Sequence, residues 1–240
     1  MSTTGLFYAY AKNIKDDATC RYLITFATRD VADTWFRAVT KSVADGYKKF
    51  SAVQRVAPQF YTHNPGEGNI RETINDARVP LASDLKGKVF FTLIHDRDAR
   101  IQSIVPVLNY VDRISGKSYF IRSVADPNAF WYYDASRDIL VASSDRRSRL
   151  TITIAEKAHA AGSLILASDE VFITVASGPC IGTNIGVTNQ KDHLSRSVNP
   201  FQIKFSSLDE DFQVDYYLEG NTNLGPIARN PGKGERWEII

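Results

Sequence analysis

The run with the most distinctive chemistry is Phe130-Trp131-Tyr132-Tyr133-Asp134. In a strand, alternation sends one pair of aromatic side chains to each face. An exposed pair beside a carboxylate suits a sugar subsite, because a flat ring stacks on the apolar face of a sugar while the carboxylate pairs with its hydroxyls. We therefore take Trp131, Tyr133 and Asp134 as candidate ligand-binding residues. The alternative is that both faces of this strand are buried between layers.

A second candidate is Cys180, which lies in the turn Ser-Gly-Pro-Cys-Ile-Gly at residues 177–182. Glycines around a cysteine at this spacing are typical of a strained turn that exposes a nucleophile beside backbone N–H donors. The turn resembles the late nucleophile turn of chymotrypsin-like cysteine proteases, which are built on β-barrels. That resemblance implies an earlier histidine as the base, here His63 or His95, with Asp96 or Asp98 orienting it.

Two residues depart from that protease pattern. Ile181 follows the cysteine where the family has glycine, and Pro179 precedes it. We therefore favour a β-turn with a small apolar cysteine packed beneath it. No catalytic residue is assigned.

The densest basic cluster is Asp145-Arg146-Arg147-Ser148-Arg149. Its guanidinium groups are suited to phosphate or sulfate, although a charged hairpin tip is the commoner meaning of such a cluster. The four histidines show no pair at metal-ligand spacing, and no Cys-x-x-Cys pattern occurs. Gly178, Gly182 and Gly186 do not fit a phosphate-binding loop, since no Gly-Lys-Ser/Thr follows them. We expect no metal and no cofactor.

Composition restricts the partners. The 240 residues carry 29 basic and 27 acidic side chains, a net charge of +2. This balance argues against a dedicated nucleic-acid binder, and no apolar run is long enough for membrane insertion. The N-terminus lacks a secretory pattern, no Asn-x-Ser/Thr sequon occurs and there are only two cysteines, so we expect a cytoplasmic protein.

The elements that must position these residues fall into two parts. Residues 1–64 predict a small α+β part, in which a helix begins after Thr28, ends near Gly46 and turns Trp35 inward. A strand is expected from residue 51, followed by a breaker-rich loop over residues 64–69 and a short helix over residues 70–77. The boundary between the two parts is expected within residues 64–86. Residues 86–240 predict many short strands separated by turns, which is typical of a β-barrel or a β-sandwich. Among them are a strand over residues 101–107 and an alternating strand from Phe201 to Phe205 that follows a longer polar loop.

The second part states one pattern three times: an apolar strand, a turn and an alternating strand, at roughly 40–45-residue spacing. The three statements begin at Ile139, Ile185 and Leu224. Such a repeat resembles the β-trefoil, in which three units close a barrel and a large apolar residue from each plugs it. The corresponding residues are Ile152, Ile203 or Phe205, and Trp237. A β-sandwich is the alternative, since the third unit is short.

The trefoil resemblance implies that function lies in the turns, which adds Asn189, Asn221 and Asn230 as amide partners for a sugar. Together with the missing catalytic constellation, this resembles the intracellular lectins of fruiting bodies and similar defence proteins. The resemblance implies a non-enzymatic, carbohydrate-binding protein whose partner is a glycan or glycoprotein. The alternatives are a protein-binding or self-assembling module that forms a homo-oligomer, and, third, a cysteine protease using Cys180.

Overall fold

The computed structural model describes residues 5–15, 19–94, 110–157, 161–188, 192–199, 201–215 and 224–240. The chain forms two compact units, which divide between Asp112 and Arg113. Each has its own hydrophobic core.

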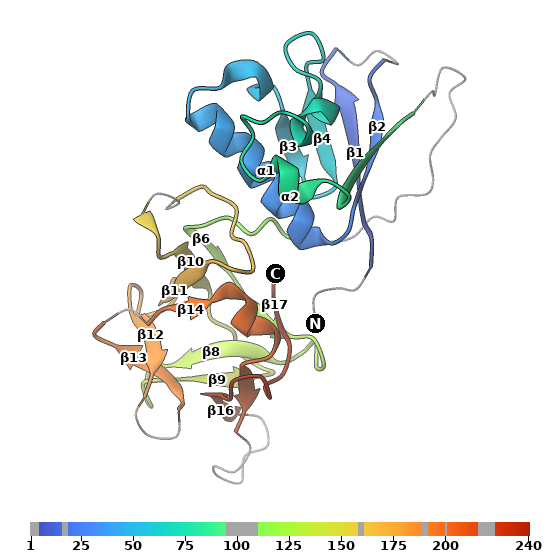
Figure 1. The fold of residues 1–240 in the computed structure, drawn as a ribbon. Coiled ribbons are helices and arrows are strands. Elements are labelled where there is room, and N and C mark those ends of the chain that lie inside the picture. The colour runs from blue at the N-terminus through green and yellow to red at the C-terminus, as the bar shows by residue number, and fades with distance from the viewer. Residues whose placement is uncertain are drawn as a thin grey trace. The chain divides into compact units, whose positions relative to one another are not determined.

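The N-terminal unit is built on a five-stranded sheet in the order β3-β4-β1-β2-β5 (Figure 1). Strand β1 pairs antiparallel with β2 and parallel with β4. Its strands are β1 (Phe7–Asn13), β2 (Tyr22–Phe26), β3 (Gln54–Ala57), β4 (Phe60–His63) and β5 (Val89–Leu93).

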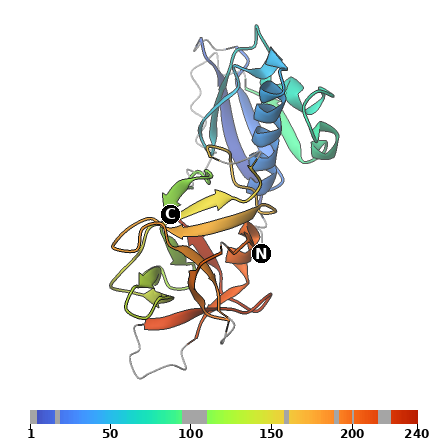
Figure 2. The same cartoon turned by 90° about the vertical axis from the view of Figure 1, so that its left-hand side faces the viewer.

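Helix α1 (Arg29–Ala44) covers one face of this sheet (Figure 2). It begins as the sequence predicts, because the Thr28 side chain accepts a hydrogen bond from the Val31 N–H at 3.2 Å. Gly46 follows its end with a φ of +98°, which glycine tolerates. Trp35 is fully buried and donates its indole N–H to Thr73 at 2.9 Å. The predicted helix and its inward tryptophan are confirmed.

Short helices complete the N-terminal unit, and two expectations need correction here. The expected strand from residue 51 starts later, at Gln54, because a 3₁₀ turn precedes it. The expected helix over residues 70–77 is a shorter 3₁₀ segment capped by Asn69. The helices are η1 (Lys48–Phe50), η2 (Ile70–Ile74) and α2 (Ala82–Leu85).

The division between the units lies later than the expected start at residue 86. Strand β5 pairs with β2 from Val89 opposite Phe26 to Leu93 opposite Tyr22, so it belongs to the N-terminal unit. At the edge of the sheet, β5 forms backbone hydrogen bonds with β2, and its residue Val89 is buried in the core of the N-terminal unit. The expected strand over residues 101–107 lies outside the described residues.

The C-terminal unit is mainly β. Its strands are β6 (Lys117–Tyr119), β7 (Ile121–Ser123), β8 (Phe130–Asp134), β9 (Ile139–Ser143), β10 (Leu150–Ile154), β11 (Glu170–Val175), β12 (Asn184–Val187), β13 (Leu194–Ser197), β14 (Ile203–Lys204), β15 (Phe212–Val214), β16 (Leu224–Arg229) and β17 (Trp237–Ile239). The 3₁₀ helix η4 (Phe205–Asp209) joins β14 to β15.

These twelve strands form one nearly closed, barrel-like sheet. Its main path runs β17-β7-β8-β9-β13-β12-β11-β10-β6, and β14, β15 and β16 pair beside it. The expected plug residues Ile152, Ile203, Phe205 and Trp237 are all buried in the one core of this unit. The mainly β, barrel-like expectation is confirmed, and one continuous barrel-like sheet replaces the alternative of a two-sheet sandwich.

Two details of the repeat differ from expectation. The alternating run from Phe201 to Phe205 forms a strand only at Ile203–Lys204, because the chain turns into η4. Strand β13 was expected as loop, since its sequence Leu-Ser-Arg-Ser lacks an apolar alternation. It pairs with β12 over four residues and with β9 at Ile139.

Among the described residues, no helix is long and apolar enough to cross a membrane.

Candidate functional site

Trp131 and Tyr133 lie in the core, which corrects the expectation that they bind ligand. Trp131 is 0% exposed, and its ring packs edge-on against Phe212 and Trp237 at centroid distances of 5.4 and 5.7 Å. The Tyr133 hydroxyl donates to the Asp138 carboxylate. Burial, together with Asp138, raises the Tyr133 pKa. Neither ring is available to stack on a sugar.

The outward face of β8 therefore carries Phe130 and Tyr132. Both side chains are partly exposed, in the alternating burial pattern that period 2 predicts. The strand is fixed on its inner side by the core and along its edge by five residue pairs with β9. Phe130 and Tyr132 are thus two partly exposed rings on a strand that is anchored in the sheet.

The basic cluster follows β9 and runs back along β8. Buried Ser148 anchors it: its N–H donates to the Trp131 carbonyl at 3.0 Å, and its hydroxyl accepts from the Tyr133 N–H at 2.9 Å. The Arg146 N–H donates to the Ser143 hydroxyl at 3.1 Å, and the Arg149 N–H to the Ser177 hydroxyl at 2.9 Å. With Ser148 turned inward, the neighbouring arginines project outward.

Those arginines lie over aromatic rings. The Arg147 guanidinium carbon is 4.6 Å from the Phe120 ring centroid and 5.4 Å from that of Phe130. Arg149 lies 5.1 Å from Phe120, and Arg146 lies 5.4 Å from Tyr132. These distances are within the range of cation–π attraction. We call Phe120, Phe130, Tyr132, Arg146, Arg147 and Arg149 the aromatic–arginine patch.

Phe120 comes to this patch from a third segment, between β6 and β7. Its N–H donates to the Ile240 carbonyl at 3.0 Å, and its carbonyl accepts from the Ile240 N–H at 2.9 Å. No local pattern marks Phe120 as a site residue, since its position depends on these hydrogen bonds to the distant Ile240. Phe130, Tyr132 and the arginines stood in two runs that the sequence did single out.

The other expected ligand residues are not gathered around Trp131. The Asp134 carboxylate accepts hydrogen bonds from the Ser136 hydroxyl and N–H at 2.6 and 2.9 Å, and Ser136 holds the pKa of Asp134 below its ordinary value. Asn230, after β16, donates its amide to Gln213 at 2.9 Å. The Asp134 side chain thus shapes the turn after β8, and the Asn230 side chain bonds to strand β15. Asn189 and Asn221 lie outside the described residues.

Cys180 is half-buried against the core of the C-terminal unit. Its expected base, His63, belongs to the N-terminal unit. There the His63 Nδ1 accepts from the Ile70 N–H at 3.3 Å and Nε2 lies 2.8 Å from the Cys20 carbonyl, so both nitrogens bond to the backbone. His95, Asp96 and Asp98 lie outside the described residues. The interactions of His63 give no support to a protease site at Cys180.

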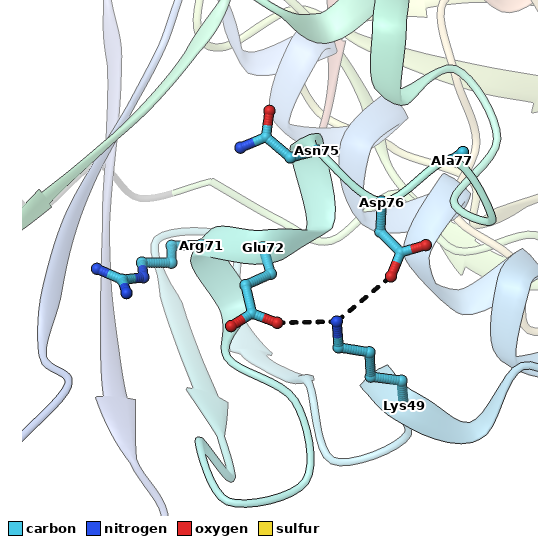
Figure 3. A pocket seen from close by; sticks show the side chains of 6 residues that line it. All are labelled: Lys49, Arg71, Glu72, Asn75, Asp76 and Ala77. Carbon is cyan, nitrogen blue, oxygen red and sulfur yellow. Dashed lines mark hydrogen bonds and ion pairs between the residues drawn. The ribbon is translucent and has the colours of Figure 1, made fainter.

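A separate hollow of about 410 Å³ lies in the N-terminal unit (Figure 3). Lys49 Nζ lies in it, 2.8 Å from a Glu72 carboxylate oxygen and 3.4 Å from one of Asp76. The Glu72 carboxylate raises the pKa of Lys49. Because these charges neutralise one another and no aromatic ring lines the hollow, it lacks the features that sugar stacking requires. Its remaining lining residues are Arg71, Asn75 and Ala77.

No group of three or more His, Cys, Asp or Glu side chains within the described ranges could hold a metal ion.

No protein-family model matches this chain, and no curated protein matches it either. Among solved structures, a chain from a complex of a BBKI mutant with bovine trypsin is similar over 55% of this chain and 93% of its own. The two are 15% identical with a TM-score of 0.36, which does not establish a common fold.

Proposed function

We propose that this protein is a non-enzymatic, lectin-like carbohydrate-binding protein, and that its site is the aromatic–arginine patch. The observation that carries the proposal is the partial exposure of Phe130 and Tyr132, two rings on the outer face of a rigid strand. Sugar rings stack on such surfaces through their apolar C–H faces. Neighbouring guanidinium groups supply the hydrogen-bond donors that would pair with hydroxyl oxygens.

We infer that the barrel has a β-trefoil arrangement. Ile152, Phe205 and Trp237 come from the three statements of the repeat and are buried in the same core, which supports this inference. We keep the fruiting-body lectin type, the defence role and the cytoplasmic location as proposals. The two free cysteines, Cys20 and Cys180, support a reducing compartment.

A glycan array tests the proposed function. The wild-type chain, labelled away from the patch, is expected to bind a defined subset of glycans, and soluble competitor of the same structure is expected to remove the signal. Binding to no glycan across neutral, amino-sugar, sialylated and sulfated groups would contradict the proposal. The Trp131→Phe variant is expected to retain the wild-type pattern, because Trp131 lies in the core.

Self-association through the N-terminal unit is a second candidate function. The sheet of this unit carries exposed apolar side chains: Val56 and Phe90 are each 59% exposed, and Tyr10 stacks on Phe60 with centroids 5.8 Å apart. Exposed apolar side chains of this kind are found at protein contacts.

Sedimentation velocity across protein concentration tests this second candidate. A dimer that Phe90→Lys dissociates, and that Val198→Lys on the C-terminal unit leaves intact, would support it. Val198 is 92% exposed and so provides a matched apolar control. A monomer at every concentration would contradict it.

A further inference from the structure

Two arginines of the aromatic–arginine patch carry charge that is not neutralised within the described part of the chain. Neither Arg147 nor Arg149 has an ion pair or a side-chain hydrogen bond with any described residue. Arg122, on the neighbouring strand β7, by contrast pairs with Glu238 at 2.5 Å. Two unpaired guanidinium groups two residues apart on a rigid segment form a site of positive charge.

The aromatic rings hold these guanidinium groups without using their hydrogen-bond donors. Phe120 lies beneath both arginines, 4.6 Å from Arg147 and 5.1 Å from Arg149. A guanidinium has five N–H donors and stays charged at every physiological pH, so contact with a ring face leaves its donors free for an anion. The rings also reduce the rotamer freedom that binding would otherwise have to remove.

The nearby acidic groups are engaged elsewhere. The Asp145 carboxylate accepts from the Ser144 hydroxyl at 3.2 Å, and the Asp134 carboxylate is bonded to Ser136 and lies 3.7 Å from Arg137 Nε. Arg146 contacts the Tyr132 hydroxyl at 3.4 Å, which together with Asp134 and Asp145 raises its pKa. Arg146 thus lies beside the acidic residues Asp134 and Asp145. The positive charge of the patch that no neighbouring carboxylate offsets is that of Arg147 and Arg149.

We propose that the patch selects anionic glycans: a sulfate or carboxylate group binds Arg147 and Arg149 while the sugar ring lies against Phe130 and Tyr132. The inference rests on the proposed function and adds the class of ligand to it. Bidentate pairing between guanidinium and oxyanion provides direction as well as attraction, so the anion would fix how the sugar ring sits on the aromatic rings.

Calorimetric titration with three probes of equal length tests the selection. They are a heparin-derived tetrasaccharide, the same tetrasaccharide after complete desulfation and N-acetylation, and neutral chitotetraose. The first carries sulfates and carboxylates, the second carboxylates alone, and the third no charge. We expect the sulfated probe to bind at least tenfold more tightly than chitotetraose, with the desulfated probe between them if carboxylates contribute.

Charge-removing variants locate the effect. Arg147→Gln and Arg149→Gln are each expected to weaken binding of the sulfated probe about tenfold, since one charge-assisted hydrogen-bond pair is lost. Both should weaken chitotetraose binding less than binding of the sulfated probe, because chitotetraose offers the guanidinium groups hydroxyl oxygens and no anion. The control is the triple variant Lys48→Gln/Lys86→Gln/Lys88→Gln, which removes three exposed positive charges from the N-terminal unit. It should bind every probe as the wild type does.

Three outcomes overturn the inference. Equal affinity for sulfated and neutral probes shows that charge is not selected, and the proposed carbohydrate function then stands alone. If the triple lysine variant loses as much affinity for the sulfated probe as the arginine variants do, the probe is attracted by net charge only. Equal or tighter binding of a single-stranded DNA of the same charge, insensitive to Phe130→Ala, points to polyanion binding without sugar recognition. If no carbohydrate binds, the proposed function fails together with the inference.

Discussion

The indole rings of Trp131 and Trp237 meet edge to face in the core of the C-terminal unit, with centroids 5.7 Å apart. They come from strands β8 and β17, which lie far apart in the sequence and on either side of β7 in the sheet. Their contact joins the end of the chain to the strand that carries Phe130 and Tyr132. The aromatic–arginine patch therefore depends on a core that the last strand completes.

The two tryptophans provide a matched pair for stability. Trp131→Ala is expected to lower the free energy of unfolding of the C-terminal unit by about 3–5 kcal/mol, because it leaves a large cavity. Trp131 Nε1 is buried without a hydrogen-bond partner among the described residues, whereas Trp237 Nε1 donates to the Phe212 carbonyl at 3.0 Å. Trp237→Phe should therefore destabilise more than Trp131→Phe, by about 1 kcal/mol. Urea denaturation followed by circular dichroism measures both, and the reverse order would contradict this packing.

A buried ion pair in the N-terminal unit gives a second prediction. Arg55 Nη1 lies 2.7 Å from Asp33 Oδ1, and the two side chains are 4% and 1% exposed. Asp33→Asn removes the buried counter-charge of Arg55 and leaves it paired with the partly exposed Asp112, whose Oδ1 lies 2.9 Å from Arg55 Nη2. We therefore expect a loss of about 3–5 kcal/mol in unfolding free energy. Asp45→Asn, at the exposed pair with Lys41, should change it by less than about 1 kcal/mol. Similar urea midpoints for the two variants would contradict the structural role of Asp33.

Stability of the N-terminal unit should also depend on the protonation of His63. Burial lowers its pKa in the folded chain below the ordinary value of 6.5, so the unfolded chain binds the proton more strongly. The stability that neutral His63 contributes is therefore complete above about pH 6.5 and is lost as the pH falls from there through the lowered folded pKa. We expect the stability difference between wild type and His63→Gln to shrink from pH 7.5 to pH 5. A difference that is constant or grows toward acid would contradict this sign.

Ser148 is predicted to be a positioning residue for the arginines. The Ser148 hydroxyl accepts a hydrogen bond from the Tyr133 N–H. Removing the hydroxyl leaves this buried backbone donor without that acceptor. Ser148→Ala should cost about 1–3 kcal/mol in stability and weaken binding of the sulfated tetrasaccharide severalfold. Ser144→Ala is the control, since Ser144 is exposed and, within the described residues, its hydroxyl bonds to Asp145 alone. Unchanged affinity in a folded Ser148→Ala variant would contradict the positioning role.

How much the sequence could predict differs from feature to feature. Local signals sufficed for α1, since Thr28 caps it and the spacing of its apolar residues turns Trp35 inward. Alternation likewise predicted that residues 130–134 form a strand with two distinct faces. It could not decide which face is buried, because Phe212 and Trp237, from distant strands, fill the space against Trp131. The choice of Trp131 and Tyr133 as exposed residues was wrong for this reason.

Long-range pairing also explains the other differences. Strand β5 reads like the strands that follow it, and only its pairing with β2 assigns it to the N-terminal unit. Strand β13 forms without apolar alternation, since β12 and β9 supply backbone partners along both its edges. Phe120 reaches the patch through its hydrogen bonds to Ile240 at the other end of the unit. None of these pairings can be predicted from the local sequence.

The measurement that tests the central claim most directly compares two double variants by titration with the best glycan from the array. Phe130→Ala/Tyr132→Ala removes both rings of the patch, and Phe90→Ala/Tyr8→Ala removes one phenylalanine and one tyrosine from the sheet of the N-terminal unit. We predict that the first weakens binding about tenfold or more while the chain stays folded, and that the second leaves the affinity unchanged. Full affinity in the folded Phe130→Ala/Tyr132→Ala variant would contradict the assignment of carbohydrate binding to the aromatic–arginine patch.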